Sequence, residues 1–271
     1  MTTHRLLNRR MAIAEMGKAG LAIVVFGAAA CSDRSGSVST TAAPGAIPST
    51  TALPDSTGGD ATTTSPPPAD NTTTAPATTD FQRVSLDFVS AYILYRGGEA
   101  ALVDTGVEGS APAIEAALGE AGLAWDSVGH VILTHKHPDH VGSVDEVMSQ
   151  VPGATLYAGA PDIPQIDSAV VPQPVGDGDR IFDLEIIASP GHTPGHICVL
   201  DAAAGILVAG DAMVGADGGV AGPDPAFTED LDLALDSVGK LAGFSYEVAL
   251  FGHGEPVLES ASAAVSALAE G

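Results

Sequence analysis

Basic residues are scarce in this chain of 271 residues, and the shortage excludes several kinds of partner. Ten Lys and Arg stand against 34 Asp and Glu, which gives a formal net charge of −24 at pH 7. Nucleic acids are bound through Lys and Arg side chains, so a chain this acidic is not expected to bind them. Anionic membrane surfaces are disfavoured for the same reason. Two cysteines are too few for a scaffold held together by disulfides.

The apolar run near the N-terminus is too short to span a membrane. It covers residues 21–30, whereas a membrane-spanning helix needs about 20 apolar residues. Basic residues before the run and small residues at its end predict a signal peptide over residues 1–30. The segment resembles a bacterial lipoprotein signal, although Ala28 replaces the usual Leu, and Arg9-Arg10 resembles a twin-arginine signal. This resemblance implies export to the cell surface with a lipid anchor at Cys31; ordinary secretion and a buried N-terminal helix are the alternatives.

Residues 31–80 are predicted to be a disordered linker. Thr, Ser, Pro and Ala make up 35 of the 49 residues from 32 to 80, and no aromatic residue is present. Such a segment cannot bury enough apolar surface to offset the entropy of ordering. The remaining residues, 81–271, hold 28 acidic and five basic residues and are predicted to form one domain.

Short apolar runs alternate with amphipathic segments in the predicted domain. Strands are expected at 91–95, 100–103, 128–133, 181–187, 197–200, 205–209 and 248–251. Helices are expected at 110–122, 143–150, 230–241 and 259–270. This order indicates an α/β fold in which two sheets pack face to face under outer helices.

Potential metal ligands are concentrated in the segment that follows the strand at 128–133. Its sequence is Thr-His-Lys-His-Pro-Asp-His, residues 134–140. His135 and His137, two positions apart on an extended segment, can point the same way, and Asp139 and His140 can point to a second site nearby. Imidazole and carboxylate ligands together suit Zn²⁺, and also Fe or Mn.

Further motifs place a His or Asp close after other apolar runs. They are Gly191-His-Thr-Pro-Gly-His196, Gly210-Asp211 and Gly252-His253-Gly254, and Leu102-Val-Asp-Thr-Gly106 precedes them all. Taken in order with residues 134–140, they resemble the motifs of the metallo-β-lactamase-fold superfamily over the whole of 81–271. The resemblance implies a four-layer αββα fold, in which helices flank two packed mixed sheets.

The same resemblance implies a binuclear centre that acts on a small-molecule substrate. His135, His137 and His192 would hold the first metal, Asp139, His140 and His253 the second, and Asp211 would bridge both. Two Zn²⁺ ions are expected, with Fe or Mn as alternatives. A metal-bridging hydroxide would attack the substrate, because paired cations lower the pKa of shared water. Asp139 and Asp211 are the predicted catalytic residues.

Other residues near these motifs receive supporting or structural roles. His196 is expected to support the ligands or to pack in the core, and Asp104 to brace the ligand loop. His130 is expected at the surface or in the core, and Cys198 to be a buried small hydrophobic residue. Residues 215–225, which are rich in Gly, are expected to form a flexible segment near the metals that shapes substrate access.

The predicted reaction depends on how this sequence differs from particular branches of the superfamily. Asp211 as a bridging ligand favours the glyoxalase II-like and lactonase-like branches, although the 18 residues after His253 are too few for the helical glutathione-binding domain of typical glyoxalase II. We therefore expect a hydrolase of a small ester, thioester or lactone. The alternatives are a mononuclear iron enzyme like the persulfide dioxygenases and a β-lactam hydrolase. A binding protein without catalysis is disfavoured because no expected ligand is missing.

Overall fold

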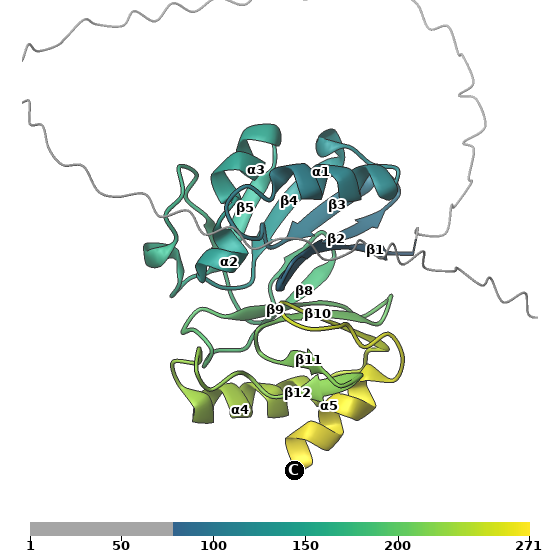
Figure 1. The fold of residues 1–271 in the computed structure, drawn as a ribbon, viewed down its shortest axis with the longest axis vertical. Coiled ribbons are helices and arrows are strands. Elements are labelled where there is room, and N and C mark those ends of the chain that lie inside the picture. The colour runs from purple at the N-terminus through teal and green to yellow at the C-terminus, as the bar shows by residue number, and fades with distance from the viewer. Residues whose placement is uncertain (1–77) are drawn as a thin grey trace, which may run out of the picture. The chain divides into compact units, whose positions relative to one another are not determined.

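Two β-sheets lie face to face in the part of the chain that the structure, a computed structural model, describes, residues 78–271 (Figure 1). The predicted signal peptide, Cys31 and nearly all of the predicted linker lie outside the described residues. The first strand begins at Asp80, one residue before the expected start of the domain. None of the helices between residues 78 and 271 is long and apolar enough to cross a membrane.

The first sheet has six strands and is mixed. β1, β2 and β3 pair antiparallel, and β3, β4, β5 and β6 pair parallel. Their order in the sheet is the order in the chain: β1 (Asp80–Leu86), β2 (Val89–Arg96), β3 (Glu99–Val103), β4 (Val128–Leu133), β5 (Thr155–Gly159) and β6 (Gln173–Val175).

The second sheet has five strands, of which only the pair at one edge is parallel. In spatial order they are β13 (Val248–Phe251), β10 (Ile206–Gly210), β9 (Ile197–Asp201), β8 (Leu184–Ala188) and β7 (Arg180–Ile181). A separate hairpin is formed by β11 (Val214–Ala216) and β12 (Gly219–Ala221).

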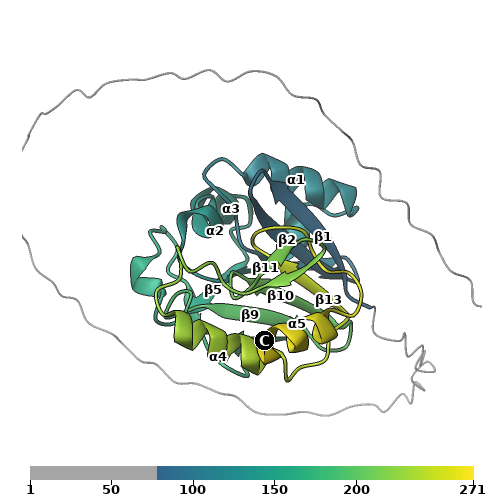
Figure 2. The same ribbon diagram turned by 60° about the horizontal axis from the view of Figure 1, so that its bottom comes forward.

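Four α-helices cover the outer faces of the sheets. In Figure 1, α1 (Ala111–Glu120) and α3 (Val144–Gln150) lie above the first sheet, whereas the short helix α2 (Pro138–Val141) lies lower, at one end of that sheet. Below the second sheet lie α4 (Leu231–Leu241) and α5 (Ala261–Glu270), which Figure 2 brings to the front. The N-terminus of α4 is capped by Asp230, whose carboxylate accepts the backbone N–H of Leu233. The expected αββα order of layers is confirmed.

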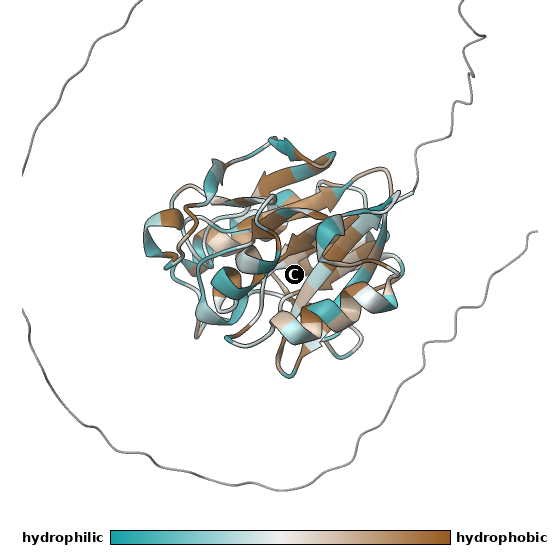
Figure 3. Cartoon of the chain, turned by 90° about the horizontal axis from the view of Figure 1, so that it is seen from above, coloured by the Kyte–Doolittle hydropathy of each residue, from teal (hydrophilic) through white to brown (hydrophobic). Residues whose placement is uncertain are grey.

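Alternating side chains on the strands explain why four layers form. On β2, Ile93 belongs to the core under α1 and α3, whereas its neighbour Leu94 points into the core between the sheets. On β10, Val208 faces the central core and Leu207 the core under α4 and α5. Both faces of the central strands are therefore apolar, and each sheet needs cover on both sides. Figure 3 shows this concentration of hydrophobic residues on the strands.

The structure adds detail to two expectations about local structure. Residues 181–187 are predicted as a strand broken by polar residues, and the break is a turn: Phe182 and Asp183 adopt positive φ angles of 53° and 57° and lead the chain from β7 into β8. This left-handed conformation at two consecutive residues is what a tight hairpin turn requires. Residues 215–225, expected to form a flexible segment, include β12 and two of the three residues of β11, and their flexibility stays a prediction.

Candidate metal centre

All seven predicted ligands follow the ends of strands at one end of the two sheets. His135, His137, Asp139 and His140 come after β4, His192 after β8, Asp211 after β10 and His253 after β13. The two sheets are joined here by the backbone, since the N–H of Ile197 donates to the carbonyl of Thr134 at 2.9 Å. The packing of one sheet on the other thus brings together loops that are more than 100 residues apart in the chain.

The first group of ligand atoms comes from His135, His137 and His192. Nδ1 of His137 lies 3.0 Å from Nε2 of His135 and 3.0 Å from Nε2 of His192, and the three nitrogens lie within 4.8 Å of one another. A tetrahedral Zn²⁺ ion separates its nitrogen ligands by about 3.3 Å, given Zn–N distances of about 2.0–2.1 Å. The three imidazoles therefore fit one metal ion.

A second group is formed by Asp139, His140 and His253, whose ligand atoms also lie within 4.8 Å of one another. Oδ2 of Asp139 is 3.3 Å from Nε2 of His253 and 3.7 Å from Nε2 of His140. The donor set of two imidazoles and one carboxylate fits Zn²⁺, Fe or Mn.

Asp211 lies between the two groups. One of its oxygens, Oδ2, is 3.5 Å from Nε2 of His192 and 3.2 Å from Nε2 of His253, and Oδ1 is 3.4 Å from Nε2 of His140. Nε2 of His140 and Oδ1 of Asp211 are buried without a hydrogen-bond partner. Buried polar atoms are normally satisfied, so this pair fits a cation between them.

Hydrogen bonds behind the second group fix how His140 and His253 present their rings. Nδ1 of His140 donates to Oδ2 of Asp104 at 2.8 Å, and Nδ1 of His253 donates to the carbonyl of Phe88 at 2.8 Å. Each bond directs the Nε2 atom toward the site, as is usual for metal-binding imidazoles. Asp104 also accepts the hydroxyl of Thr134 at 2.8 Å, which agrees with the bracing role expected for it.

The remaining rings are held in a similar way. Thr134 Oγ1 lies 3.0 Å from Nδ1 of His135, and Thr228 Oγ1 lies 3.3 Å from Nδ1 of His192. Nε2 of His196 accepts the backbone N–H of Asp211 at 3.0 Å, so its Nδ1 donates to Ser189 at 2.8 Å. His196 thus supports Asp211 rather than joining either group of ligand atoms.

The backbone approaches the site so closely at Gly252 that a side chain has no space there. A Cβ atom on Gly252 would overlap Oδ1 of Asp211 and come within 2.6 Å of Cε1 of His140. The carbonyl of Gly252 also accepts the N–H of Ser90 at 2.8 Å, which holds the loop between β13 and His253 against β2. Gly252 therefore allows the His253 loop to close over the second group.

Burial and charge set the protonation of the two groups differently. Burial lowers the pKa of His135 well below its usual value and the pKa of His192 to about 4. Burial also lowers the pKa of His140, but the carboxylates of Asp211 and Asp104 outweigh it and raise that pKa well above its usual value. Hydrogen bonds with Asp139 and Asp211 raise the pKa of His253 to about 10. A metal ion bound by the second group would therefore compete with protons for His140 and His253.

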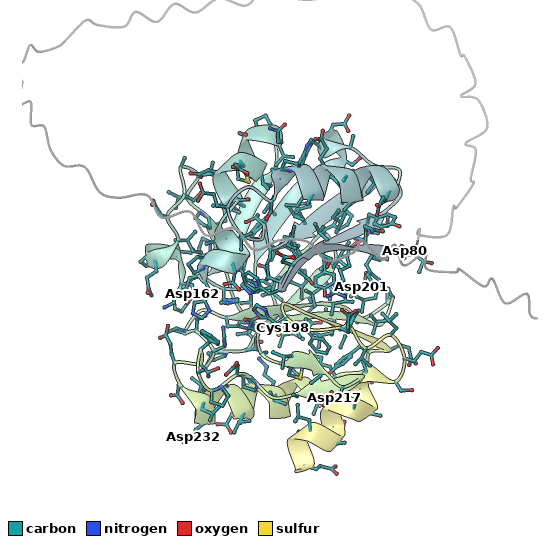
Figure 4. The ribbon with its side chains drawn as sticks, in the orientation of Figure 1. Asp80, Asp162, Cys198, Asp201, Asp217 and Asp232 are labelled. Carbon is teal, nitrogen blue, oxygen red and sulfur yellow. The ribbon has the colours of Figure 1, made fainter. Side chains whose placement is uncertain are left out.

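Asp162 is a buried charged residue at the site that the sequence patterns did not identify. Its Oδ2 accepts the hydroxyl of Thr193 at 2.6 Å and the N–H of Lys136 at 3.1 Å, and its Oδ1 accepts the N–H of Gly195 at 2.7 Å. Figure 4 shows Asp162 between the two halves of the molecule. It ties the His135–His140 loop to the His192 loop. The available signal was an acidic residue just after the apolar run of β5.

Two residues with expected structural roles lie away from both ligand groups. His130 is partly buried beside Tyr157 and Phe182, with its ring centroid 5.6 Å from that of Phe182. Cys198 is fully buried on β9, as expected, and its thiol lies 3.1 Å from the hydroxyl of Ser189. Figure 4 shows Cys198 within the second sheet.

Comparison with known proteins gives matches over the described domain. The family model described as the metallo-beta-lactamase superfamily matches residues 84–253. Thioesterase pkgB of Emericella nidulans is 30% identical over 65% of this chain and 48% of its own length. The hydroxyacylglutathione hydrolase of Klebsiella pneumoniae is 42% identical over 25% of this chain and 27% of its own. This chain thus spans half or less of either relative.

A solved structure shares the fold. A metallo-beta-lactamase family protein from Thermus thermophilus aligns with a TM-score of 0.57 at 24% identity, over 71% of this chain and 78% of its own. At this identity the likeness concerns the fold, and it agrees with the two packed mixed sheets and flanking helices described above.

Proposed function

Because the chain belongs to the metallo-β-lactamase superfamily of metal-dependent hydrolases, we propose that residues 81–271 form a binuclear hydrolase of small esters, thioesters or lactones. One observation carries the proposal. The Asp211 carboxylate lies between two groups of ligand atoms, and its Oδ1 is buried opposite Nε2 of His140 with no partner for either atom. A metal ion held by the second group would give both atoms a partner.

The ligand assignment follows from the two groups. His135, His137 and His192 would hold the first metal, Asp139, His140 and His253 the second, and Asp211 would contact both. Five imidazoles with two carboxylates favour Zn²⁺, and the same donors accept Fe or Mn. The metals, when bound, would lower the pKa of water and polarise the substrate carbonyl.

The chain's own residues would position the reactants. Asp139 is half-buried and lines the cavity over the ligand groups, so its carboxylate can orient the attacking water and accept its proton. Asp211 is held from behind by the hydrogen bond between its backbone N–H and His196. That support fixes the carboxylate between the two groups before substrate binds, and such preorganisation lowers the cost of reaching the transition state.

The reaction class is supported by the carboxylate at Asp211 and by a relative named a thioesterase. We also propose that the enzyme is exported and works at the cell surface, tethered through Cys31 and the Thr- and Pro-rich segment. This placement depends on the N-terminal sequence alone.

A metal analysis combined with an oxygen measurement tests the function. The enzyme should contain close to two metal ions per chain and should turn over esters, thioesters or lactones under strict anaerobiosis. Oxygen from labelled water should enter the product acid. Stoichiometric consumption of O₂ with one bound iron would instead establish a dioxygenase, and turnover of β-lactams alone would establish a β-lactamase.

The variant His140→Ala sharpens this test. It should remove most of the hydrolytic rate while the first metal stays in place, because His135, His137 and His192 are unchanged. The matched control is His130→Ala, since His130 belongs to neither ligand group. If His140→Ala kept two metals and the full rate, the second site would be assigned wrongly.

A further inference from the structure

A large cavity lies directly over the two ligand groups. Its volume is about 770 Å³, and His137, Asp139, His192, Asp211 and His253 line its floor. A space of this size accepts a substrate of drug-like dimensions. The walls of the cavity would therefore select which ester, thioester or lactone reaches the two ligand groups.

Those walls are mainly apolar. Phe88, Val107, Pro138, Val214 and Phe227 line the cavity. Phe88 and Phe227 are 62% and 68% exposed, although large aromatic side chains usually gain by being covered. The ring of Phe88 is also parallel to that of His253, with an interplanar angle of 5° and centroids 6.1 Å apart. An apolar substrate group could pack on both exposed rings beside the reacting centre.

The charged residues in these walls carry one sign. Glu108 and Asp224 line the cavity, and both are exposed. Among residues 78–271, no Lys or Arg lines it. An anionic group held away from the metals would therefore meet carboxylates, and like charges placed together disfavour binding.

The cations of the described domain are all engaged elsewhere. Each of the five Lys and Arg residues between 78 and 271 forms an ion pair with a carboxylate: Arg83 with Glu255, Arg96 with Asp183, Lys136 with Glu229, Arg180 with Glu185 and Lys240 with Asp177.

Lys136 is the cation closest to the site in sequence, since it stands between His135 and His137. Its Nζ is 2.7 Å from Oε1 of Glu229 and 2.9 Å from Oε1 of Gln165, and its side chain is mostly buried. To contact a substrate anion, Lys136 would have to give up both partners.

We infer that the substrate is a neutral molecule whose acyl or leaving group is apolar, and that the cavity discriminates against substrates with a negative charge remote from the reacting carbonyl. This inference rests on the proposed hydrolase function. It disfavours acyl carriers with carboxylate or phosphate groups, and it favours uncharged esters, uncharged thioesters and lactones. Phe88 and Phe227 would bind the apolar group, and Glu108 and Asp224 would repel anions.

Two aryl acetates that differ in one remote charge provide the test. Methyl 4-acetoxybenzoate is neutral, and 4-acetoxybenzoate carries a carboxylate on the far side of the ring. Each kcat/KM value is divided by the rate constant for uncatalysed hydrolysis of the same ester. For the metal-loaded enzyme, this quotient should be at least tenfold higher for the neutral ester. For 4-nitrophenyl esters, kcat/KM should rise from acetate to hexanoate. The unreactive amides, methyl 4-acetamidobenzoate and 4-acetamidobenzoate, should show the same preference in binding measured by titration calorimetry.

Variants locate the origin of these preferences. Glu108→Gln combined with Asp224→Asn should bring the ratio between neutral and anionic esters closer to one, whereas Glu115→Gln on the outer face of α1 should leave it unchanged. Phe227→Ala should weaken the preference for long acyl chains. The control for that change is Val171→Ala, because Val171 is 77% exposed and lies outside the cavity.

The outcomes separate the two proposals. Equal or faster turnover of the anionic acetate, or equal binding of the anionic amide, would overturn the inference and leave the hydrolase function standing. If the metal-loaded enzyme hydrolysed no ester, thioester or lactone, the proposed function would be wrong and the inference would fall with it.

Discussion

The carboxylate of Asp162 accepts the hydroxyl of Thr193 at 2.6 Å, although the two residues are 31 positions apart. Thr193 directly follows the predicted ligand His192, and the same carboxylate accepts the N–H of Lys136, directly after His135. One buried side chain thus fixes the distance between two loops that carry the first ligand group. Neither Asp162 nor Thr193 belongs to that group.

Loss of Asp162 should therefore destabilise the protein and disturb the first group. We expect Asp162→Ala to lower the free energy of unfolding by about 2–4 kcal/mol, because it leaves buried donors on three residues unpaired. Urea unfolding and metal analysis would measure both effects. The control Asp236→Ala, on the exposed face of α4, should change stability by no more than about 0.5 kcal/mol. Equal stability of the two variants would refute the proposed role.

Removal of metal should lower both activity and thermal stability. Each metal that binds only the folded state stabilises it by mass action, so chelation should reduce Tm and re-addition should restore it. Asp211→Ala should reduce metal occupancy more than any single change confined to one group, because Asp211 contacts both. Plasma mass spectrometry gives the metal content. An Asp211→Ala variant with two metals and full activity would exclude the bridging role.

Asp104 should control the second metal site without touching a metal. In Asp104→Asn the charge that orients Nδ1–H of His140 is lost, while Asn still tolerates the left-handed backbone at this position, where φ is 63°. We expect the affinity for the second metal to fall about 10–100-fold. The first metal should be affected less, as competition with a chelating dye would reveal. An unchanged second affinity would show that the hydrogen bond to His140 has no such effect.

Cys198 should make the fold sensitive to alkaline pH. Burial raises the pKa of its thiol to about 12, whereas the unfolded thiol has a pKa of about 9. Between these values the unfolded state loses a proton that the folded state keeps, so stability is complete below pH 9 and declines as pH rises. The decline should not exceed about 1.4 kcal/mol per pH unit for this group. Urea unfolding at pH 8, 9 and 10 should show a shallower decline in Cys198→Ala, and an identical decline would contradict the prediction.

The N-terminal proposal can be tested on the native protein. Mass spectrometry should find a chain that begins at Cys31 and carries acyl groups, and Cys31→Ser should release the domain from the membrane fraction. An unprocessed form that begins at Met1 in the cytoplasm would rule out export.

The sequence by itself was sufficient to name the superfamily and to single out the seven ligand candidates. His135, His192, Asp211 and His253 each stand next to or close after an apolar strand, and a local signal of that kind can be read from residue type and spacing. The strands β2, β3, β9, β10 and β13 can be predicted from sequence too, because their apolar runs are continuous where both faces are buried. In β4 such a run is limited to Val131–Leu133. Short strands such as β6, β11 and β12 carry too few residues for such a pattern.

The tertiary structure decided everything that depends on pairing across the chain. Asp162 meets Thr193, Gly195 and Lys136 only because the loops after β4, β5 and β8 converge where the two sheets pack together. Phe88 reaches the cavity through a turn that contacts His253, 165 positions away. Neither Asp162 nor Phe88 stands in a sequence motif that marks its role. Their roles depend on hydrogen bonds and on a cavity formed by residues far apart in the chain. The ligand candidates could thus be identified from residue type and local spacing. The hydrogen bonds that hold their loops, and the shape of the cavity beside them, depend on tertiary packing.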